Sequence, residues 1–192
     1  IELNGKHIAG HSLDNRASVA ALTVCLEEIR NFNLAWNVLA VATTREEISL
    51  AGAKTSAYGL RPDLAIVVDV TFAKGPGTND YRTFPLGGGP TIGTGSDNHP
   101  ALTRKFISLA EEMDLPHDIE AMPENSGTDG MVLPVTANGI PTVVLGLPLR
   151  YMHTSVEMAA VNDIERIGRL LARFITQLKT DSMTTLFEEE NV

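Results

Sequence analysis

Residues 64–70 have the sequence Leu-Ala-Ile-Val-Val-Asp-Val, and this stretch decides the fold. An almost unbroken run of β-branched and aliphatic residues is typical of a strand that is buried on both faces of a sheet. The charged residue within it, Asp69, requires partners because burying a lone carboxylate is costly. Three further segments have the apolar character of short strands: residues 37–42, 117–122 and 141–146.

Helical patterns alternate with these strands. Apolar residues recur at helical spacing in residues 16–30, 48–59, 100–113, 128–138 and 161–178. Pro134 should bend or shorten the fourth of these helices. Residues 74–98 are rich in glycine and proline and predict a long loop. Strands alternating with helices predict an α/β fold with a mostly parallel or mixed central sheet and helices on both faces.

The composition excludes several classes of protein. The 192 residues fit one domain, and 15 Lys and Arg against 24 Asp and Glu give a net charge of −9. Such an acidic chain repels phosphate backbones, so we expect no nucleic-acid partner. No apolar run approaches the roughly 18 residues that cross a bilayer, so we expect no membrane association. The single cysteine, Cys25, forms no internal disulfide, which favours an intracellular, cytoplasmic protein.

Acidic residues and one histidine follow the predicted strands. In an open α/β sheet, ligands bind beyond the carboxyl ends of the strands. Asp14 precedes the first helix, the pair at 46 and 47 follows residues 37–42, Asp69 ends its strand, and His153 follows residues 141–146. Crowded carboxylates require a cation, and oxygen ligands with an imidazole suit zinc, cobalt or manganese. Taken singly, each residue has an ordinary explanation, such as a helix cap for Asp14 or a solvated loop for the glutamate pair.

Five ordered motifs occur along the chain. They are Leu13-Asp14-Asn15-Arg16, Thr44-Arg45-Glu46-Glu47 with Ala51-Gly52-Ala53, Val68-Asp69-Val70-Thr71, Gly127-Thr128-Asp129, and Pro148-Leu149-Arg150-Tyr151-Met152-His153-Thr154 with Glu157. Together they resemble the dinuclear metal aminopeptidases of the glutamyl and deblocking type. Some of these are known as tetrahedral-particle aminopeptidases, and relatives were once labelled endoglucanases. Each motif is weak alone, but their order and spacing make the resemblance specific.

The resemblance implies a zinc-peptidase-like fold and a role for each matching residue. Asp14 resembles the carboxylate that bridges two divalent metals, Glu46 the general base, and Glu47 a metal ligand. Asp69 resembles a ligand of the other metal, and His153 completes the metal held by Glu47. Three residues resemble parts of the substrate cleft: Thr128, Asp129 and Arg150. The implied activity is release of N-terminal residues from peptides through a metal-activated water.

One departure from the family is large. Members carry an earlier His-x-Asp motif, whose histidine is the last ligand of the Asp69 metal, and no histidine here stands two residues before an aspartate. The resemblance implies that residues 1–10 are the last strand of an inserted β-rich assembly domain that is otherwise absent. Residues 11–180 then form the C-terminal part of the catalytic domain, and residues 181–192 a solvated tail. We expect no partner within the chain for the strand in residues 1–10.

These observations leave three functional hypotheses. The first is an aminopeptidase with two metals in the full-length protein, of which this chain binds at most one tightly and has low or no activity. The second is a metal-dependent amidohydrolase that acts on acylated amino acids. The third is a catalytically silent metal-binding fragment. The resemblance also implies homo-oligomers, from dimer to dodecamer, for the full-length protein but not for this chain.

Overall fold

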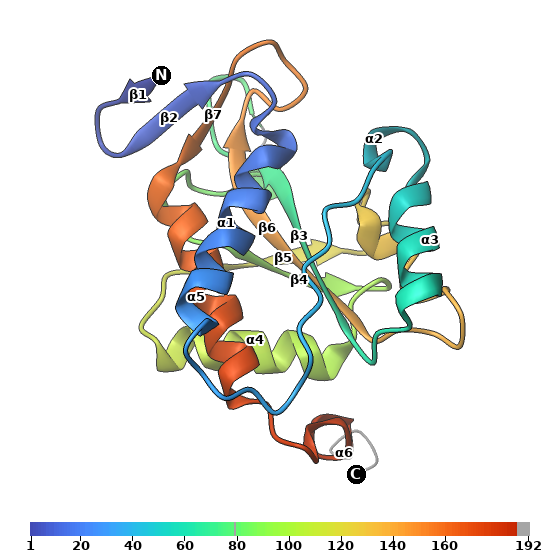
Figure 1. Cartoon of the computed structure of the whole chain (residues 1–192). Coiled ribbons are helices and arrows are strands. Elements are labelled where there is room, and N and C mark those ends of the chain that lie inside the picture. The colour runs from blue at the N-terminus through green and yellow to red at the C-terminus, as the bar shows by residue number, and fades with distance from the viewer. Residues whose placement is uncertain (79, 188–192) are drawn as a thin grey trace.

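The sheet is built around β6 (Thr142–Arg150), the most deeply buried strand of the computed structural model, which describes residues 1–78 and 80–187. β3 (Ala65–Phe72) pairs with β6 in parallel, from Ala65 opposite Thr142 to Phe72 opposite Leu149. β4 (Thr91–Gly95) and β7 (Glu157–Ala160) each pair with β6 antiparallel. β5 (Asp118–Met122) runs parallel to β4, and a hairpin of β1 (Glu2–Leu3) and β2 (His7–Gly10) pairs with β7. The result is a seven-stranded mixed sheet (Figure 1).

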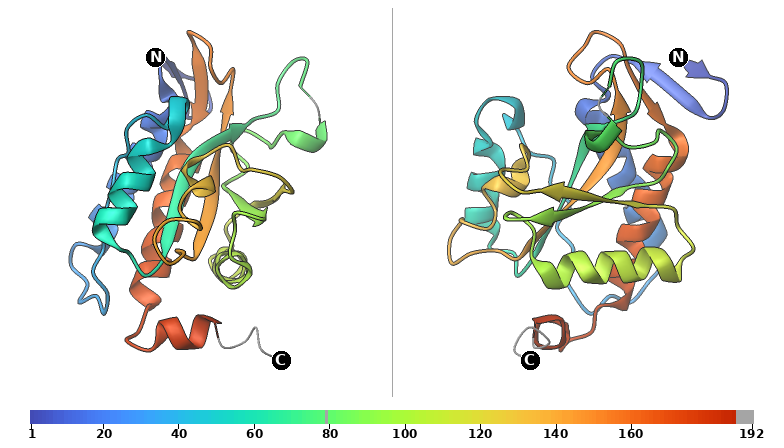
Figure 2. Two further views of the ribbon diagram at one scale, coloured as in Figure 1. Left: turned by 90° about the vertical axis from the view of Figure 1, so that its right-hand side faces the viewer. Right: turned by 180° about the vertical axis from the view of Figure 1, so that it is seen from behind.

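Side chains of β6 alternate between two hydrophobic clusters. The larger cluster contains Val143, Leu145 and Leu147, and it is completed by α1 (Leu13–Ile29), α4 (Pro100–Glu112) and α5 (Val161–Gln177). The smaller cluster contains Val144 and residues of α3 (Ala51–Leu60). Figure 2 shows α1 and α5 on one side of the sheet and α4 on the other, so helices cover both faces. This confirms the predicted α/β fold with a mixed sheet.

The remaining helices are short. α2 (Glu46–Ser49) precedes α3, and α6 (Ser182–Phe187) ends the described chain. Two 3₁₀ turns, η1 (Asp80–Arg82) and η2 (Asp129–Met131), lie in loops. The N-terminal hairpin and α6 lie at opposite ends of the molecule (Figure 2). Among the described residues, no helix combines the length and apolarity that crossing a membrane demands.

Most predicted elements are present. The strands predicted at 64–70 and 117–122 correspond to β3 and β5, and the helices at 16–30, 100–113 and 161–178 correspond to α1, α4 and α5. The strand predicted at 141–146 continues to Arg150. The helix predicted at 48–59 is divided at Leu50, whose φ of 54° is left-handed and cannot continue a helix.

Two predictions were wrong. Residues 37–42 form no strand; they run as an exposed, irregular segment, and no described strand pairs with them. An apolar run indicates that a segment is hydrophobic, but a strand also requires a second strand that pairs with it in register. The helix predicted at 128–138 is reduced to η2, followed by turns. Pro134 lacks an N–H and disfavours helical geometry in the residue before it.

Other elements were not anticipated. β4 lies within the predicted loop 74–98, and β7 was too short to recognise. The strand in residues 1–10 was expected to lack a partner in the chain, but β2 pairs with β7. Part of the predicted solvated tail, residues 181–192, forms α6, while residues 188–192 lie outside the described part.

Candidate metal centre

Three of the predicted metal ligands converge at one end of the sheet. Asp14 lies in the first turn of α1, Glu47 in α2, and His153 in the loop between β6 and β7, and these three segments lie at the upper end of the view in Figure 1. Nε2 of His153 is 3.2 Å from Oδ2 of Asp14 and 3.3 Å from Oε2 of Glu47. One potential ligand atom from each residue lies within 4.8 Å of the other two.

These separations fit a single transition metal. Zinc binds imidazole nitrogen and carboxylate oxygen at about 2.0–2.2 Å, so two ligand atoms of a tetrahedral site lie roughly 3.3 Å apart. Both distances from Nε2 of His153 agree with that value. Without a metal, a protonated His153 would form ion pairs with the same two carboxylates. The donor set therefore fits a divalent cation, with one nitrogen and two oxygens.

Asp14 is held where the chain turns from β2 into α1. The preceding Ser12 has a left-handed φ of 55°, and Asp14 itself has non-helical backbone angles. Burial, and then the charge of Glu47, raise the pKa of Asp14 to about 6. The Asp14 carboxyl therefore takes up a proton in mildly acidic solution unless a cation is near it.

The glutamate pair lies on a tightly turned segment. Arg45 before α2 and Leu50 after it both have left-handed φ angles, of 63° and 54°. The N–H of Gly52 donates to the carbonyl oxygen of Thr44 at 3.1 Å, and a Cβ at position 52 would lie 2.2 Å from that oxygen. A glycine is therefore required for α3 to approach the chain just before Glu46. Burial, followed by the charge of Glu47, raises the pKa of Glu46 to about 7.

Asp69 lies beside the triad but is not one of its three members. Its Oδ1 accepts hydrogen bonds from Nδ2 of Asn15 at 2.7 Å and from the N–H of Val70 at 2.8 Å. Burial raises the pKa of Asp69 to about 7, against the opposing effect of the Val70 N–H. The charges of Glu46 and Asp14 contribute to this increase, so Asp69 belongs to the same electrostatic cluster.

The predicted substrate residues lie in different surroundings. Thr128 accepts a hydrogen bond from the N–H of Gly130 through its hydroxyl, which caps η2. Oδ2 of Asp129 accepts from the hydroxyl of Thr43 at 2.5 Å, while its buried Oδ1 has no hydrogen-bond partner among the described residues. Burial raises the pKa of Asp129. Nε of Arg150 donates to the carbonyl oxygen of Lys74 at 2.5 Å, which places this side chain against the loop after β3.

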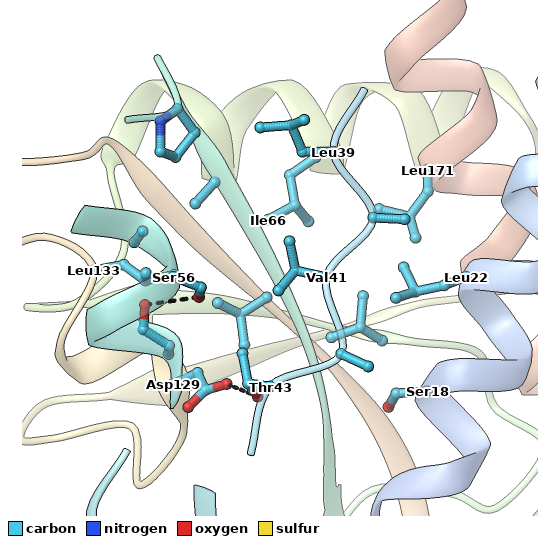
Figure 3. Close-up of a pocket in the computed structure, with 18 of the residues that line it drawn as sticks. Ser18, Leu22, Leu39, Val41, Thr43, Ser56, Ile66, Asp129, Leu133 and Leu171 are labelled. Carbon is cyan, nitrogen blue, oxygen red and sulfur yellow. Dashed lines mark hydrogen bonds between the residues drawn. The ribbon is translucent and has the colours of Figure 1, made fainter. Parts of the chain in front are cut away.

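A cavity of about 900 Å³ opens beside the acidic cluster. The irregular segment that carries Leu39, Val41 and Thr43 runs through it, between α1 and α5 on one side and β3 and α3 on the other (Figure 3). Most of the residues that these elements contribute are apolar. Five acidic residues of the site also line it: Asp14, Glu46, Glu47, Asp69 and Asp129. The cavity therefore joins an apolar interior to the candidate metal centre.

Sequence reasoning missed the residues that hold the ligands in place. Asn15 bonds Asp69 through its amide, Thr43 bonds Asp129, and Glu157 accepts from the backbone N–H groups of Asp14 and His153. Asn15 and Glu157 fall within the recognised motifs, but nothing in their spacing reveals these contacts.

Comparisons with known proteins agree with this geometry. Residues 1–170 match a family described as M42 glutamyl aminopeptidase. A lysyl aminopeptidase from Pyrococcus furiosus is 31% identical over 172 residues, which cover 90% of this chain and 49% of that protein. The crystal structure of a TET aminopeptidase from a marine sediment archaeon of the Thaumarchaeota has a TM-score of 0.88 at 26% identity, covering 97% of this chain and 54% of its own. The Pyrococcus horikoshii TET1 peptidase, which can assemble into a tetrahedron or a large octahedral shell, has a TM-score of 0.77 at 29% identity, covering 92% and 52%. This chain spans about half the length of the relatives it matches.

Proposed function

The chain belongs to the M42 glutamyl aminopeptidase family, and from that premise we propose that it carries most of the catalytic residues of a metal-dependent aminopeptidase. The proposed reaction is release of N-terminal residues from peptides. The observation that carries the proposal is the convergence of one imidazole and two carboxylates on a common point, at distances suited to one metal. A cavity beside that point offers space for a peptide.

The proposed ligands divide between two metal positions. Asp14, Glu47 and His153 hold the first, and Asp14 bridges to a second that includes Asp69. Zinc, cobalt and manganese all accept such ligands. The second position has no imidazole in this sequence, so we expect this chain to bind at most one metal tightly, with two in the full-length protein.

Glu46 is the proposed general base. A divalent metal at this site supplies an acidified water molecule and polarises the substrate carbonyl. Glu46 accepts the proton of the attacking water and returns it to the leaving amine. Glu46 suits this role by position, because its carboxyl directly precedes the proposed ligand Glu47 and lines the cavity beside the metal centre.

The substrate would enter along the 128–129 turn. Thr128, Asp129 and Arg150 are the proposed substrate residues, and the hydroxyl of Thr43 holds the Asp129 carboxylate in place. The net charge of −9 on the chain disfavours binding of nucleic acid. The single cysteine favours a cytoplasmic location. By similarity to the TET1 peptidase, we propose that the full-length protein forms homo-oligomers.

Two matched substitutions in the complete protein test the roles of the glutamate pair. Glu46→Gln should abolish hydrolysis of aminoacyl p-nitroanilides while metal content, measured by plasma mass spectrometry after dialysis, stays at the wild-type level. Glu47→Gln should lower the metal content itself. Wild-type turnover in Glu46→Gln would contradict the assignment of the general base.

The two alternatives predict different results in the same assays. An amidohydrolase would cleave N-acyl amino acids in preference to aminoacyl p-nitroanilides. A silent metal-binding fragment would retain one metal per chain and cleave neither. Light scattering after size exclusion tests assembly, because the 192-residue chain alone should form no dodecamer.

A further inference from the structure

Glu157 lies behind two of the proposed ligands. It begins β7, and its residue is only 2% exposed. Oε2 accepts a hydrogen bond from the backbone N–H of Asp14 at 3.0 Å, and Oε1 accepts one from the backbone N–H of His153 at 3.1 Å. One buried carboxylate thus joins the backbones of two ligands that are 139 positions apart in the chain.

The backbone at His153 needs such support. Its φ of 62° is left-handed, which is unfavourable for a residue with a side chain. The neighbouring Tyr151, at 61°, is also left-handed. Strained backbone of this kind persists where surrounding contacts fix it, and a hydrogen bond from an N–H to a carboxylate is among the stronger contacts available.

We infer that Glu157 is the positioning residue of the metal centre, holding the backbones of Asp14 and His153 so that their side chains meet at the separation a single metal requires. The inference rests on the proposed function, since it takes Asp14 and His153 as ligands. A carboxylate suits this task because both of its oxygens accept hydrogen bonds and neither donates one. A glutamine in its place would present an amide N–H₂ to one of the two backbone N–H groups, and that hydrogen bond would be lost.

The chain contains a matched control for this effect. Asp163, in the first turn of α5, is also a fully buried carboxylate that accepts two backbone N–H groups. Its backbone partners are Gly87 and Gly89, each at 2.8 Å, and it also pairs with Arg166 at 3.2 Å, but none of the three is a proposed ligand. Asp163→Asn therefore removes a comparable interaction without touching the metal centre.

The test compares Zn²⁺ and Co²⁺ affinity in the complete protein for the wild type, Glu157→Gln and Asp163→Asn. We expect Glu157→Gln to lower affinity about 10- to 100-fold, the usual effect of losing the residue behind a metal ligand. Asp163→Asn should leave affinity within about twofold of wild type, although it lowers the melting temperature. Equal affinity in wild type and Glu157→Gln, or an equal loss in Asp163→Asn, would overturn the inference.

Amide hydrogen exchange supplies a second readout that needs no metal. In Glu157→Gln, the N–H of Asp14 or of His153 should exchange about tenfold faster, while the Gly87 and Gly89 amides keep their protection. If the glutamine variant does not fold, Glu157→Asp replaces it. Its shorter side chain keeps the charge but draws the carboxylate away from the two N–H groups, so the same faster exchange is expected. Unchanged exchange at both amides would refute the positioning role. A wild type that binds no metal but shows protected amides would instead refute the metal centre itself, so the two failures can be told apart.

Discussion

Two regions of the molecule bring ligands to the site, and they hold their backbones very differently. Asp14 and His153 are tied together through Glu157, and Asp69 is tied to α1 through Asn15. The other region, residues 31–50, contains no strand and no helix longer than the four residues of α2. The side chain of Glu47 is 57% exposed, whereas that of Asp14 is 8% exposed.

The two regions therefore have different roles in the site. Glu157 fixes the backbones of Asp14 and His153 before any metal binds, although the His153 side chain is itself 61% exposed, so this region sets the position of the metal through the backbone. The 31–50 region brings the general base and one ligand to a place that is already defined. Besides the contact of Glu47 with His153, two side chains of this region form hydrogen bonds with other parts of the described chain: Trp36 donates to the carbonyl oxygen of Lys179, and Thr43 donates to Asp129.

The strongest test of the buried region is the pH dependence of metal-free stability. The pKa of Asp69 is raised from 3.8 to about 7 in the folded chain. Between these values the folded state binds more protons than the unfolded state, so the free energy of unfolding falls as pH rises. At about 1.4 kcal/mol per pKa unit, this shift corresponds to a loss on the order of 4 kcal/mol between pH 4 and pH 8, part of which depends on the charges of Glu46 and Asp14. Urea denaturation in the presence of a chelator measures this loss.

Substitution separates this contribution from the rest of the protein. Asp69→Asn should flatten the pH dependence, because the amide does not titrate. Asp114→Asn is the control: Asp114 is exposed, and its left-handed φ of 49° suits asparagine. A metal-free protein that became more stable between pH 4 and pH 8 would contradict the burial argument. Bound metal should reverse the trend, since it favours the ionised ligands.

Removal of the imidazole should have the next largest effect. Among the described residues, His153 is the single nitrogen donor of the triad. His153→Ala should lower Zn²⁺ affinity by more than about 100-fold, beyond the range for a residue behind a ligand. His117→Ala is the control, because His117 bonds Leu115 before β5 and lies outside the triad. Competition with a coloured chelator measures both affinities, and a loss below tenfold in His153→Ala would place the metal elsewhere.

The same division explains what the sequence could predict. β3 was predictable because its apolar run is long and its register follows from burial, whereas β4 was hidden by Gly93 and Gly95 in a glycine-rich stretch. The motif positions identified Asp14, Glu47 and His153 as ligands, but Glu47 reaches the site from an irregular segment and not from the predicted strand end. The contacts of Glu157 were not predictable, because they depend on backbone N–H groups whose positions no side-chain pattern encodes.

The smallest predicted effect concerns the hydrogen bond that holds the 31–50 region next to the site. Thr43→Val keeps the shape of the side chain but removes the donor to Asp129. That residue is 9% exposed, and its other oxygen has no partner in the part of the chain that the structure describes. We expect a loss of about 1–2 kcal/mol in unfolding free energy, because a buried carboxylate loses its partner. Amide exchange should accelerate in residues 44–50 while the Asp14 and His153 amides remain protected. Glu157→Gln should do the reverse, and Thr43→Ser, which keeps the hydroxyl, should restore the wild-type pattern. If Thr43→Val also released the Asp14 and His153 amides, the two regions would form one cooperative unit, and the metal position would depend on both.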